Sequence, residues 1–253
     1  NATWNISEKG GEDMVWRIYE GQAAPLLRAF MEKVQVTGTG PEARDYNGKT
    51  DATISDLQFA ETVDDVTFAS SGNGQYADAN AGEDKTVTIT YALANGETED
   101  LHTVLQRYDF VEPELKGTIN KKALTITANN ASKTYGETQT FDGTEFTADN
   151  LQNGETISVN LTSAGAAKKA DAGSYNITAE TATAATGSGF NADNYTITYA
   201  NGELKVAKRD LTITANDVSK TYGETLAFKG TEFSADALQN NETISVKLTS
   251  DGT

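Results

Sequence analysis

The chain has 253 residues, with no cysteine, one histidine, 37 acidic and 20 basic side chains, and a formal net charge of −17. The lack of thiols excludes disulfides and cysteine-based zinc sites, and a single histidine excludes a multi-histidine metal site. Because the negative charge repels nucleic acids and anionic lipid surfaces, we expect no nucleic-acid partner, and we also expect no cofactor.

A hydrophobic fraction of 37% is low for one large core and favours several small two-layer domains. The sequence contains no run of about 18 apolar residues, so we expect no membrane insertion of this segment. A chain without cysteine also suits bacterial export, during which a protein must stay unfolded and free of crosslinks.

The first 32 residues differ in pattern from the rest. Trp4–Ile6 and Val15–Tyr19 read as strands, with Gly10–Gly11 as a turn between them. Pro25–Val34 fits either a helix face that begins at the proline or an irregular strand. Because this piece is too short to fold alone, we expect residues 1–32 to be the C-terminal tail of a preceding β module.

Residues 33–120 predict a β domain. Val34–Val36 and Thr86–Tyr91 alternate apolar and polar residues, which is typical of half-buried strands. Between these two strands, Asp78, Asn80 and Asp84 form a candidate calcium loop, since oxygen ligands at alternating positions suit that ion. A plain acidic turn is the alternative, because Gly82 leaves the fifth position of an EF-hand loop without a side-chain oxygen.

An internal repeat defines the remainder of the chain. The heptad SKTYGET at Ser132–Thr138 recurs at Ser219–Thr225, and a gapless alignment of residues 121–166 with 208–253 gives 33 identical pairs out of 46. A period of 87 residues is too long for a solenoid and suits a small domain. We therefore expect a β domain at 121–207 and a truncated second repeat at 208–253, within a longer protein.

Within the first copy, Leu124–Ala128, Ser174–Thr178 and Tyr195–Tyr199 alternate as strands, with threonine facing outward. The pair Asn201–Gly202 tolerates positive φ at both positions, so it predicts a hairpin that pairs Tyr199 with Leu204.

The connectors between these domains are short. Asn120–Ala123 and Ala207–Asp210 contain no glycine, proline or serine, unlike flexible linkers. We therefore expect small β domains arranged end to end as an elongated rod, with limited bending at each joint.

The repeated heptad itself predicts a turn. Gly136 supplies backbone angles that a β-carbon opposes, and Tyr135 is expected to bury its ring while its hydroxyl finds a partner. Lys133 and Glu137 are expected to stay in solvent. The alternative is a ligand contact repeated once per domain, with Tyr135 and Tyr222 stacking on a sugar.

Three segments resemble known bacterial families. Lys133–Glu137 and Lys220–Glu224, each after a Leu-Thr-Ile-Thr strand, resemble the MBG domain (YGX type) of bacterial surface proteins. Arg44–Thr50 is similar to the YDG domain, although Asn47 stands where that family has aspartate. Val15–Gly21 resembles a segment of filamentous-haemagglutinin-type exoproteins of the two-partner secretion route.

These resemblances imply a mainly β fold in small β-grasp-like or Ig-like units, the sequence favouring neither. They also imply a stalk or repeat region of a secreted or cell-surface adhesin, with an outer-membrane transporter as partner of the full-length parent. A host or matrix glycan or protein receptor is then a further, unidentified partner.

We therefore expect a non-catalytic segment that spaces or presents an adhesive region, for cell adhesion or biofilm formation. The alternatives are a repeated module that binds glycan or mucin through exposed tyrosines and loops, and a polysaccharide-active enzyme. Catalysis is not expected, because His102 sits among acidic residues in what reads as a solvated turn, and because the repeated acids would place one active site in every unit.

Overall fold

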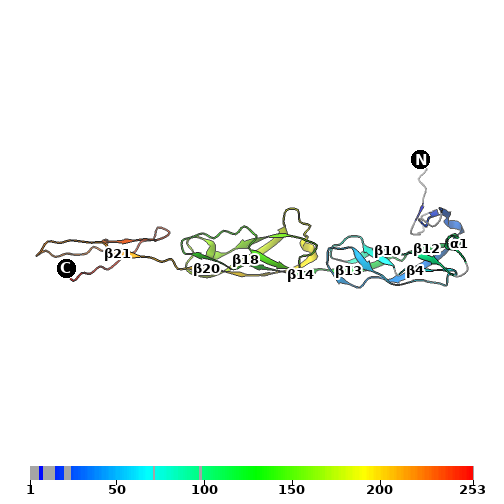
Figure 1. The fold of residues 1–253 in the computed structure, drawn as a ribbon, viewed down its shortest axis with the longest axis horizontal. Coiled ribbons are helices and arrows are strands. Elements are labelled where there is room, and N and C mark those ends of the chain that lie inside the picture. Colours follow the sequence, from blue (N-terminus) through cyan, green and yellow to red (C-terminus); the bar gives the residue numbers. More distant parts are fainter. Residues whose placement is uncertain (1–5, 8–14, 20–23, 71, 97–98, 253) are drawn as a thin grey trace, which may run out of the picture. The chain divides into compact units, whose positions relative to one another are not determined.

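The computed structural model of this chain describes residues 6–7, 15–19, 24–70, 72–96 and 99–252. Trp4 and the expected Gly10–Gly11 turn lie outside these residues. The protein is mainly β and divides into two compact units, one comprising Asn1–Ala123 with Asn191–Thr196 and the other comprising Leu124–Phe190 with Ile197–Thr253 (Figure 1). No helix among the described residues has the length and apolar character needed to cross a bilayer.

Up to Asn120, the described part of the first unit contains strands and two short helical segments. In chain order they are β1 (Ile6–Ser7), β2 (Trp16–Arg17), β3 (Leu26–Leu27), η1 (Arg28–Phe30), β4 (Glu32–Thr39), β5 (Arg44–Asp45), β6 (Asp51–Thr53), β7 (Ser55–Phe59), β8 (Val66–Phe68), β9 (Asn73–Tyr76), β10 (Gly82–Thr90), β11 (Leu93–Asn95), α1 (Leu101–Leu105), β12 (Tyr108–Val111) and β13 (Leu115–Asn120).

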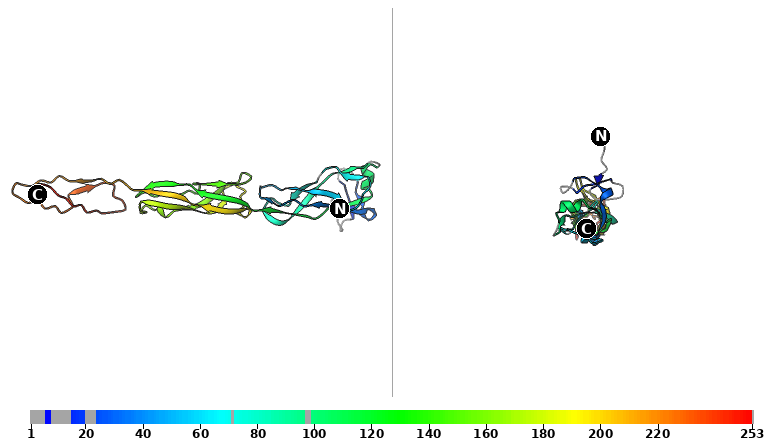
Figure 2. Two further views of the ribbon diagram at one scale, coloured as in Figure 1. Left: turned by 90° about the horizontal axis from the view of Figure 1, so that it is seen from below. Right: turned by 90° about the vertical axis from the view of Figure 1, so that its right-hand side faces the viewer.

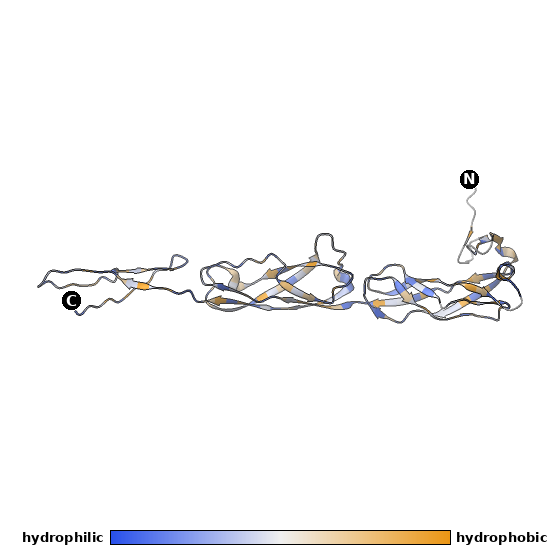
Figure 3. Cartoon of the chain, in the orientation of Figure 1, coloured by the Kyte–Doolittle hydropathy of each residue, from blue (hydrophilic) through white to orange (hydrophobic). Residues whose placement is uncertain are grey.

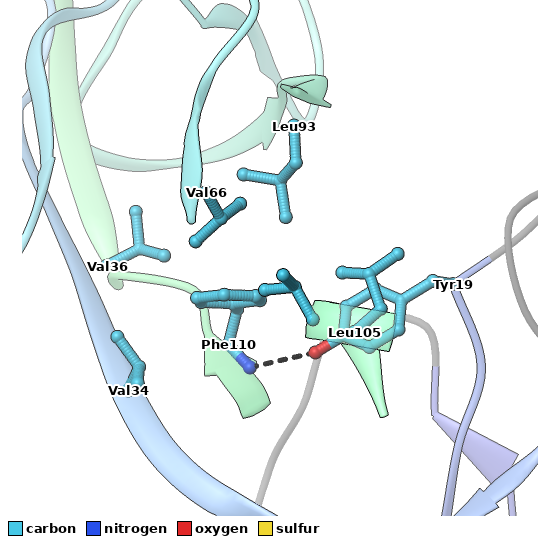
Figure 4. Close-up of a cluster of buried hydrophobic side chains, with 8 residues drawn as sticks. Tyr19, Val34, Val36, Val66, Leu93, Leu105 and Phe110 are labelled. Carbon is cyan, nitrogen blue, oxygen red and sulfur yellow. Dashed lines mark hydrogen bonds between the residues drawn. The ribbon is translucent and has the colours of Figure 1, made fainter. Parts of the chain in front are cut away.

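Four sheets build the described part of this unit. The largest has the order β5-β13-β10-β9-β6, and the others are β12-β4-β7, β11-β8 and β1-β2-β3. Side chains of β4, β8, β11, β12 and α1, together with Tyr19, form a hydrophobic cluster in which Val36, Leu105 and Phe110 are fully buried (Figure 4). The predicted alternation in β10 is confirmed, since Val87 and Ile89 are buried while the threonines between and beside them are exposed.

The N-terminal segment contributes directly to this cluster. Tyr19 is buried in it, and the hydroxyl of Tyr19 accepts a hydrogen bond from the backbone N–H of Phe110 at 3.1 Å (Figure 4). Pro25–Val34, for which a helix face or an irregular strand was expected, is broken into β3, the short η1 and the start of β4. Residues from the segment expected to end a preceding module therefore help to form the core of the first unit.

The second unit contains the first repeat copy and the partial second copy. Its elements are β14 (Lys122–Ala128), β15 (Ala131–Thr134), β16 (Phe146–Asp149), β17 (Ile157–Thr162), η2 (Ala164–Ala166), β18 (Gly173–Ala184), η3 (Ala192–Asn194), β19 (Tyr195–Ala200), β20 (Gly202–Ala207), β21 (Ile213–Ala215) and β22 (Phe233–Ala235). Within this range, Lys122, Ala123 and residues 191–196 belong to the first compact unit.

Two sheets make up the first copy, with orders β16-β14-β19 and β15-β20-β18-β17. The predicted alternation of Leu124–Ala128 is confirmed, since Leu124, Ile126 and Ala128 are buried and the threonines between them are half-buried. Figure 3 shows this mixture of apolar and hydrophilic residues along the strands. Such strands bury one face and expose the other, which suits a small two-layer domain.

The expected hairpin at Asn201–Gly202 is wrong. β19 pairs with β14, whereas β20 pairs with β18 and β15, so the chain passes from one sheet to the other at this point. A β-carbon on Gly202 would lie 2.6 Å from the carbonyl oxygen of Ala128, so glycine is needed here for a close backbone approach and not for a turn with positive φ.

The second copy is only partly organised. β21 and β22 form a two-stranded antiparallel sheet, and most of residues 208–252 lie outside strands (Figure 2).

Candidate functional site

The repeated Tyr-Gly turn follows β15. Gly136 has φ +88°, which favours glycine, and the backbone N–H of Glu137 donates to the carbonyl of Thr134 at 3.1 Å. The carboxylate of Glu137 in turn accepts from the backbone N–H of Thr134 at 2.9 Å. The expectation of a tight turn is confirmed, and Glu137 closes it instead of only facing water.

Lys133 was expected to stay in solvent, and this expectation is wrong. Its side chain is 7% exposed, and Nζ donates to the carbonyl of Glu137 at 2.8 Å and to the carbonyls of Ala166 and Ala167. A buried ammonium needs several acceptors to replace its hydration, and the turn and the η2 loop provide them. Lys133 thus fastens the Tyr-Gly turn to a loop more than 30 residues away.

Tyr135 is half-buried, so its ring is less enclosed than expected. Its hydroxyl is hydrogen-bonded to the carboxylate of Glu242 and accepts from Nδ2 of Asn240 at 3.1 Å. The bond to Glu242 raises the pKa of Tyr135 above its ordinary value. Both partners belong to the second repeat copy, so the hydroxyl of Tyr135 joins one copy to the next.

The connector between the two copies makes further polar contacts with the same turn. Arg209 donates from Nε to the carbonyl of Tyr135 at 2.8 Å and lies 3.5 Å from Oε1 of Glu137. The loop that carries Asn240 and Glu242 has positive φ at Asn240 and Asn241. The motif residues and the connector therefore form one polar joint.

A cavity of about 280 Å³ lies beside this joint. Its lining residues are Tyr135, Ala172, Lys208, Arg209, Leu211, Ala237, Leu238 and Glu242. Leu211 is the repeat counterpart of Leu124, which is 1% exposed in the first copy, whereas Leu211 is 41% exposed. Part of the apolar wall is therefore formed by the repeat counterpart of a core residue.

Tyr222, the other sugar-stacking candidate, is fully exposed. Its turn has the same geometry as that of Tyr135, since Gly223 has φ +90° and the backbone N–H of Glu224 donates to the carbonyl of Thr221 at 3.1 Å. The structure therefore places Tyr135 at a joint between copies and Tyr222 in solvent, and it does not bring the two together.

Of the three calcium candidates, Asp78 and Asn80 lie in the turn before β10, and Asp84 lies within β10. Oδ1 of Asp78 accepts from Nζ of Lys85 at 2.7 Å and from the backbone N–H of Asn80 at 2.8 Å. The bond from Lys85 holds the pKa of Asp78 below its ordinary value. The lysine ammonium already supplies a cation to this carboxylate, and no group of three or more potential metal-ligating His, Cys, Asp or Glu residues occurs in the described part of the chain.

His102 lies in the exposed face of α1 and not in a turn as expected. Asp100 caps this helix, since its carboxylate accepts from the backbone N–H of Thr103 at 3.0 Å, and this bond lowers the pKa of Asp100. Asp100, the acidic residue near His102, therefore serves as the cap of this helix.

Asn194 is a buried polar residue that the sequence patterns did not identify. It is 1% exposed, its Oδ1 accepts from the backbone N–H of Ala81 at 2.9 Å, and its Nδ2 donates to Asn80 at 3.1 Å. Next to it, the rings of Tyr195 and Tyr46 meet edge to face at 5.4 Å. All five residues belong to the first compact unit, and no repeat within the chain marks Asn194 as special.

A buried ion cluster was also not foreseen. Asp109 is 1% exposed, Oδ2 accepts from Nε of Arg28 at 2.8 Å, and Oδ1 lies 3.7 Å from Nε of Arg17. Arg17 also donates to the carbonyl of Phe110 at 3.1 Å. The cluster ties the N-terminal segment to β12, and its members are too far apart in sequence for a motif to show.

Two family models match the chain. Residues 124–205 match the MBG domain (YGX type), and residues 31–101 match the YDG domain. A search of curated proteins finds no match. The chain thus contains a YDG domain followed by an MBG domain of the YGX type.

Proposed function

We propose that this chain is a non-catalytic repeat segment of a large bacterial adhesin, in which tandem β domains space or present an adhesive region. The MBG and YDG domains support a repeat module of this kind. Adhesion or biofilm formation would then be the activity of the parent protein, and the segment would supply distance and orientation.

The main support for the proposal is that the Tyr-Gly turn of the family motif contacts the next repeat copy. Tyr135 directs its hydroxyl to Glu242 and Asn240 of the next copy, and Arg209 of the connector binds the carbonyl of Tyr135. In an array of such copies, a residue that contacts the next copy would have a structural role at each joint. This pattern favours a spacer over a catalytic module.

The proposed location is the bacterial surface or the medium, with export through an outer-membrane transporter of the two-partner type. A net charge of −17 favours solubility of a long exported array and disfavours nucleic-acid binding. The receptor of the parent adhesin would be a host or matrix glycan or protein that contacts another part of that protein.

The test compares three forms of the parent adhesin on cells: intact, lacking residues 31–207, and with these residues replaced by unrelated β domains of similar length. We expect the deletion to reduce cell adhesion while receptor binding by the purified adhesin is retained, and the replacement to restore adhesion. Loss of receptor binding in both altered forms would contradict a spacer role.

The exposure of Tyr222 supports a second candidate function, the binding of glycan or mucin. An exposed ring in a repeated motif is available to stack on a sugar. A glycan and mucin array probed with the purified chain tests this role. Binding that is abolished by Tyr222→Ala and retained in Tyr199→Ala, which changes another exposed tyrosine, would favour the second candidate; an array without signal would reject it.

A further inference from the structure

The dipeptide Asn-Gly is the sequence in which an asparagine side chain reacts most readily with its own backbone, because glycine has no β-carbon to hinder its nitrogen. It occurs at residues 47–48, 73–74, 95–96, 153–154 and 201–202. The reaction joins the glycine nitrogen to Cγ of the asparagine, so it requires a free backbone nitrogen and a side chain that can rotate toward it. The structure therefore decides which of these pairs can react.

Two of the pairs lie in sheets. Asn73 and Gly74 belong to β9, which pairs with β10 on one side and with β6 on the other. Gly202 belongs to β20 and is buried against the carbonyl oxygens of Ala128 and Asn129. Backbone nitrogens in such positions are reached only after local unfolding.

Two further pairs are held by hydrogen bonds. The backbone N–H of Gly96 donates to the carbonyl of Asp65 at 2.6 Å. Oδ1 of Asn47 accepts from Nη1 of Arg44 at 2.7 Å and from the backbone N–H of Lys49 at 3.0 Å, which fixes the side-chain amide. In each of these pairs, one group that the reaction needs is therefore already engaged.

Asn153 and Gly154 differ from the other pairs. They are the two central residues of a turn that the backbone N–H of Glu155 closes by donating to the carbonyl of Gln152 at 2.8 Å. Both have positive φ, 53° and 71°, and both are exposed. A β-carbon on Gly154 would meet no atom within 4 Å. Within the described part of the chain, neither the amide of Asn153 nor the N–H of Gly154 has a hydrogen-bond partner.

We propose that Asn153 is a site of covalent self-modification, at which asparagine converts to isoaspartate and aspartate without an enzyme. The nitrogen of Gly154 loses its proton to solvent base and attacks Cγ of Asn153. The new N–Cγ bond closes a succinimide ring, while the Cγ–Nδ2 bond breaks and ammonia leaves with a proton from water. Water then cleaves the ring at the side-chain carbonyl, which gives aspartate, or at the backbone carbonyl, which gives isoaspartate with a main chain one carbon longer.

The second repeat copy has a slower-reacting pair at the corresponding turn. Asn240 and Asn241 have φ of 54° and 62°, and the backbone N–H of Glu242 closes the turn with a bond of 2.9 Å. The β-carbon of Asn241 hinders attack by its nitrogen, and Nδ2 of Asn240 is engaged with the hydroxyl of Tyr135. The same turn geometry is therefore compatible with asparagine in place of glycine.

The experiment incubates the purified 253-residue chain in mildly alkaline buffer. Peptide mass spectrometry follows the conversion of each asparagine, and a methyltransferase that labels isoaspartate identifies that product. We expect Asn153 to react at least about tenfold faster than the other four sites, because those require local opening first. They are Asn47, Asn73, Asn95 and Asn201. In concentrated urea, which removes the turn and the sheets, the rates at all of these sites should converge.

Gly154→Asn is the matched variant, because it gives the first copy the turn sequence of the second. It should unfold at a temperature close to that of the unaltered chain and should lose most of the modification at residue 153. Equal rates at the Asn-Gly pairs of the folded chain, or faster reaction at another pair, would overturn the proposal. Undiminished reaction at residue 153 in the folded variant would do the same. The rates in the unaltered chain decide the matter even where the variant fails to fold. The reaction depends on this turn and not on the spacer role, so adhesion assays leave the result unaffected.

Discussion

Replacement of Lys133 by methionine tests whether the buried ammonium holds the Tyr-Gly turn in place. The substitution keeps much of the side-chain volume and removes the donor to the carbonyls of Glu137, Ala166 and Ala167. Hydrogen bonds to a charged group contribute about 1.5–3 kcal/mol each. The contact to Ala166 is long at 3.4 Å, so two strong bonds would be lost.

Burial of the charged ammonium costs free energy, and this cost offsets part of the stability that the two bonds supply. We therefore expect Lys133→Met to lower the free energy of unfolding by about 3 kcal/mol. For a domain of this size, that loss lowers the melting temperature by about 10–20 °C. Thermal unfolding of the 253-residue chain by calorimetry measures the effect on the transition of the first repeat copy.

Lys220→Met is the matched control, because Lys220 occupies the same position of the repeat but is exposed. We expect it to change stability by less than about 0.5 kcal/mol, as for ordinary surface substitutions. Equal shifts for the two variants, or an unchanged transition in Lys133→Met, would refute the reasoning that the carbonyl cage stabilises the domain.

Three further outcomes are expected. Gly136→Val should cost about 2–3 kcal/mol in chemical denaturation, more than Glu137→Ala, because φ is +88° at Gly136. Asn194→Ala removes the acceptor of the Ala81 amide and should destabilise the first unit by about 1–3 kcal/mol, with faster hydrogen exchange at that amide. Hydrogen bonds from the hydroxyl and the backbone N–H of Thr144 lower the pKa of Asp142. The ionised carboxylate therefore contributes fully to folding stability above the unfolded pKa of about 4. This contribution is lost as the pH falls through the lower folded pKa. The difference in melting temperature between the unaltered chain and Asp142→Asn should therefore shrink from pH 7 to pH 2.

Local patterns in the sequence predicted much of the fold. The alternation in Leu124–Ala128 predicted which side chains are buried, because a strand face is set by its own residues. The heptad predicted a turn, because the backbone requirement at Gly136 is also local.

Long-range contacts explain what the sequence could not predict. Lys133 is buried because Ala166 and Ala167 provide acceptors, and nothing near Lys133 in the sequence announces them. Tyr135 meets its partner Asn240 across 105 positions. The pair Asn201–Gly202 misled because glycine serves both turns and close backbone approaches, and only the position of Ala128 distinguishes these two uses.

The parallel pairing of β15 with β20 has a mechanical consequence. These strands lie near the beginning and the end of the first copy, and their register runs from Ala131 with Leu204 to Thr134 with Ala207. Tension between the two ends of the domain would pull these strands in opposite directions along their axes, so the hydrogen bonds between them would be loaded together in shear instead of opening one after another. Rupture of the domain would then require several of these hydrogen bonds to fail at once.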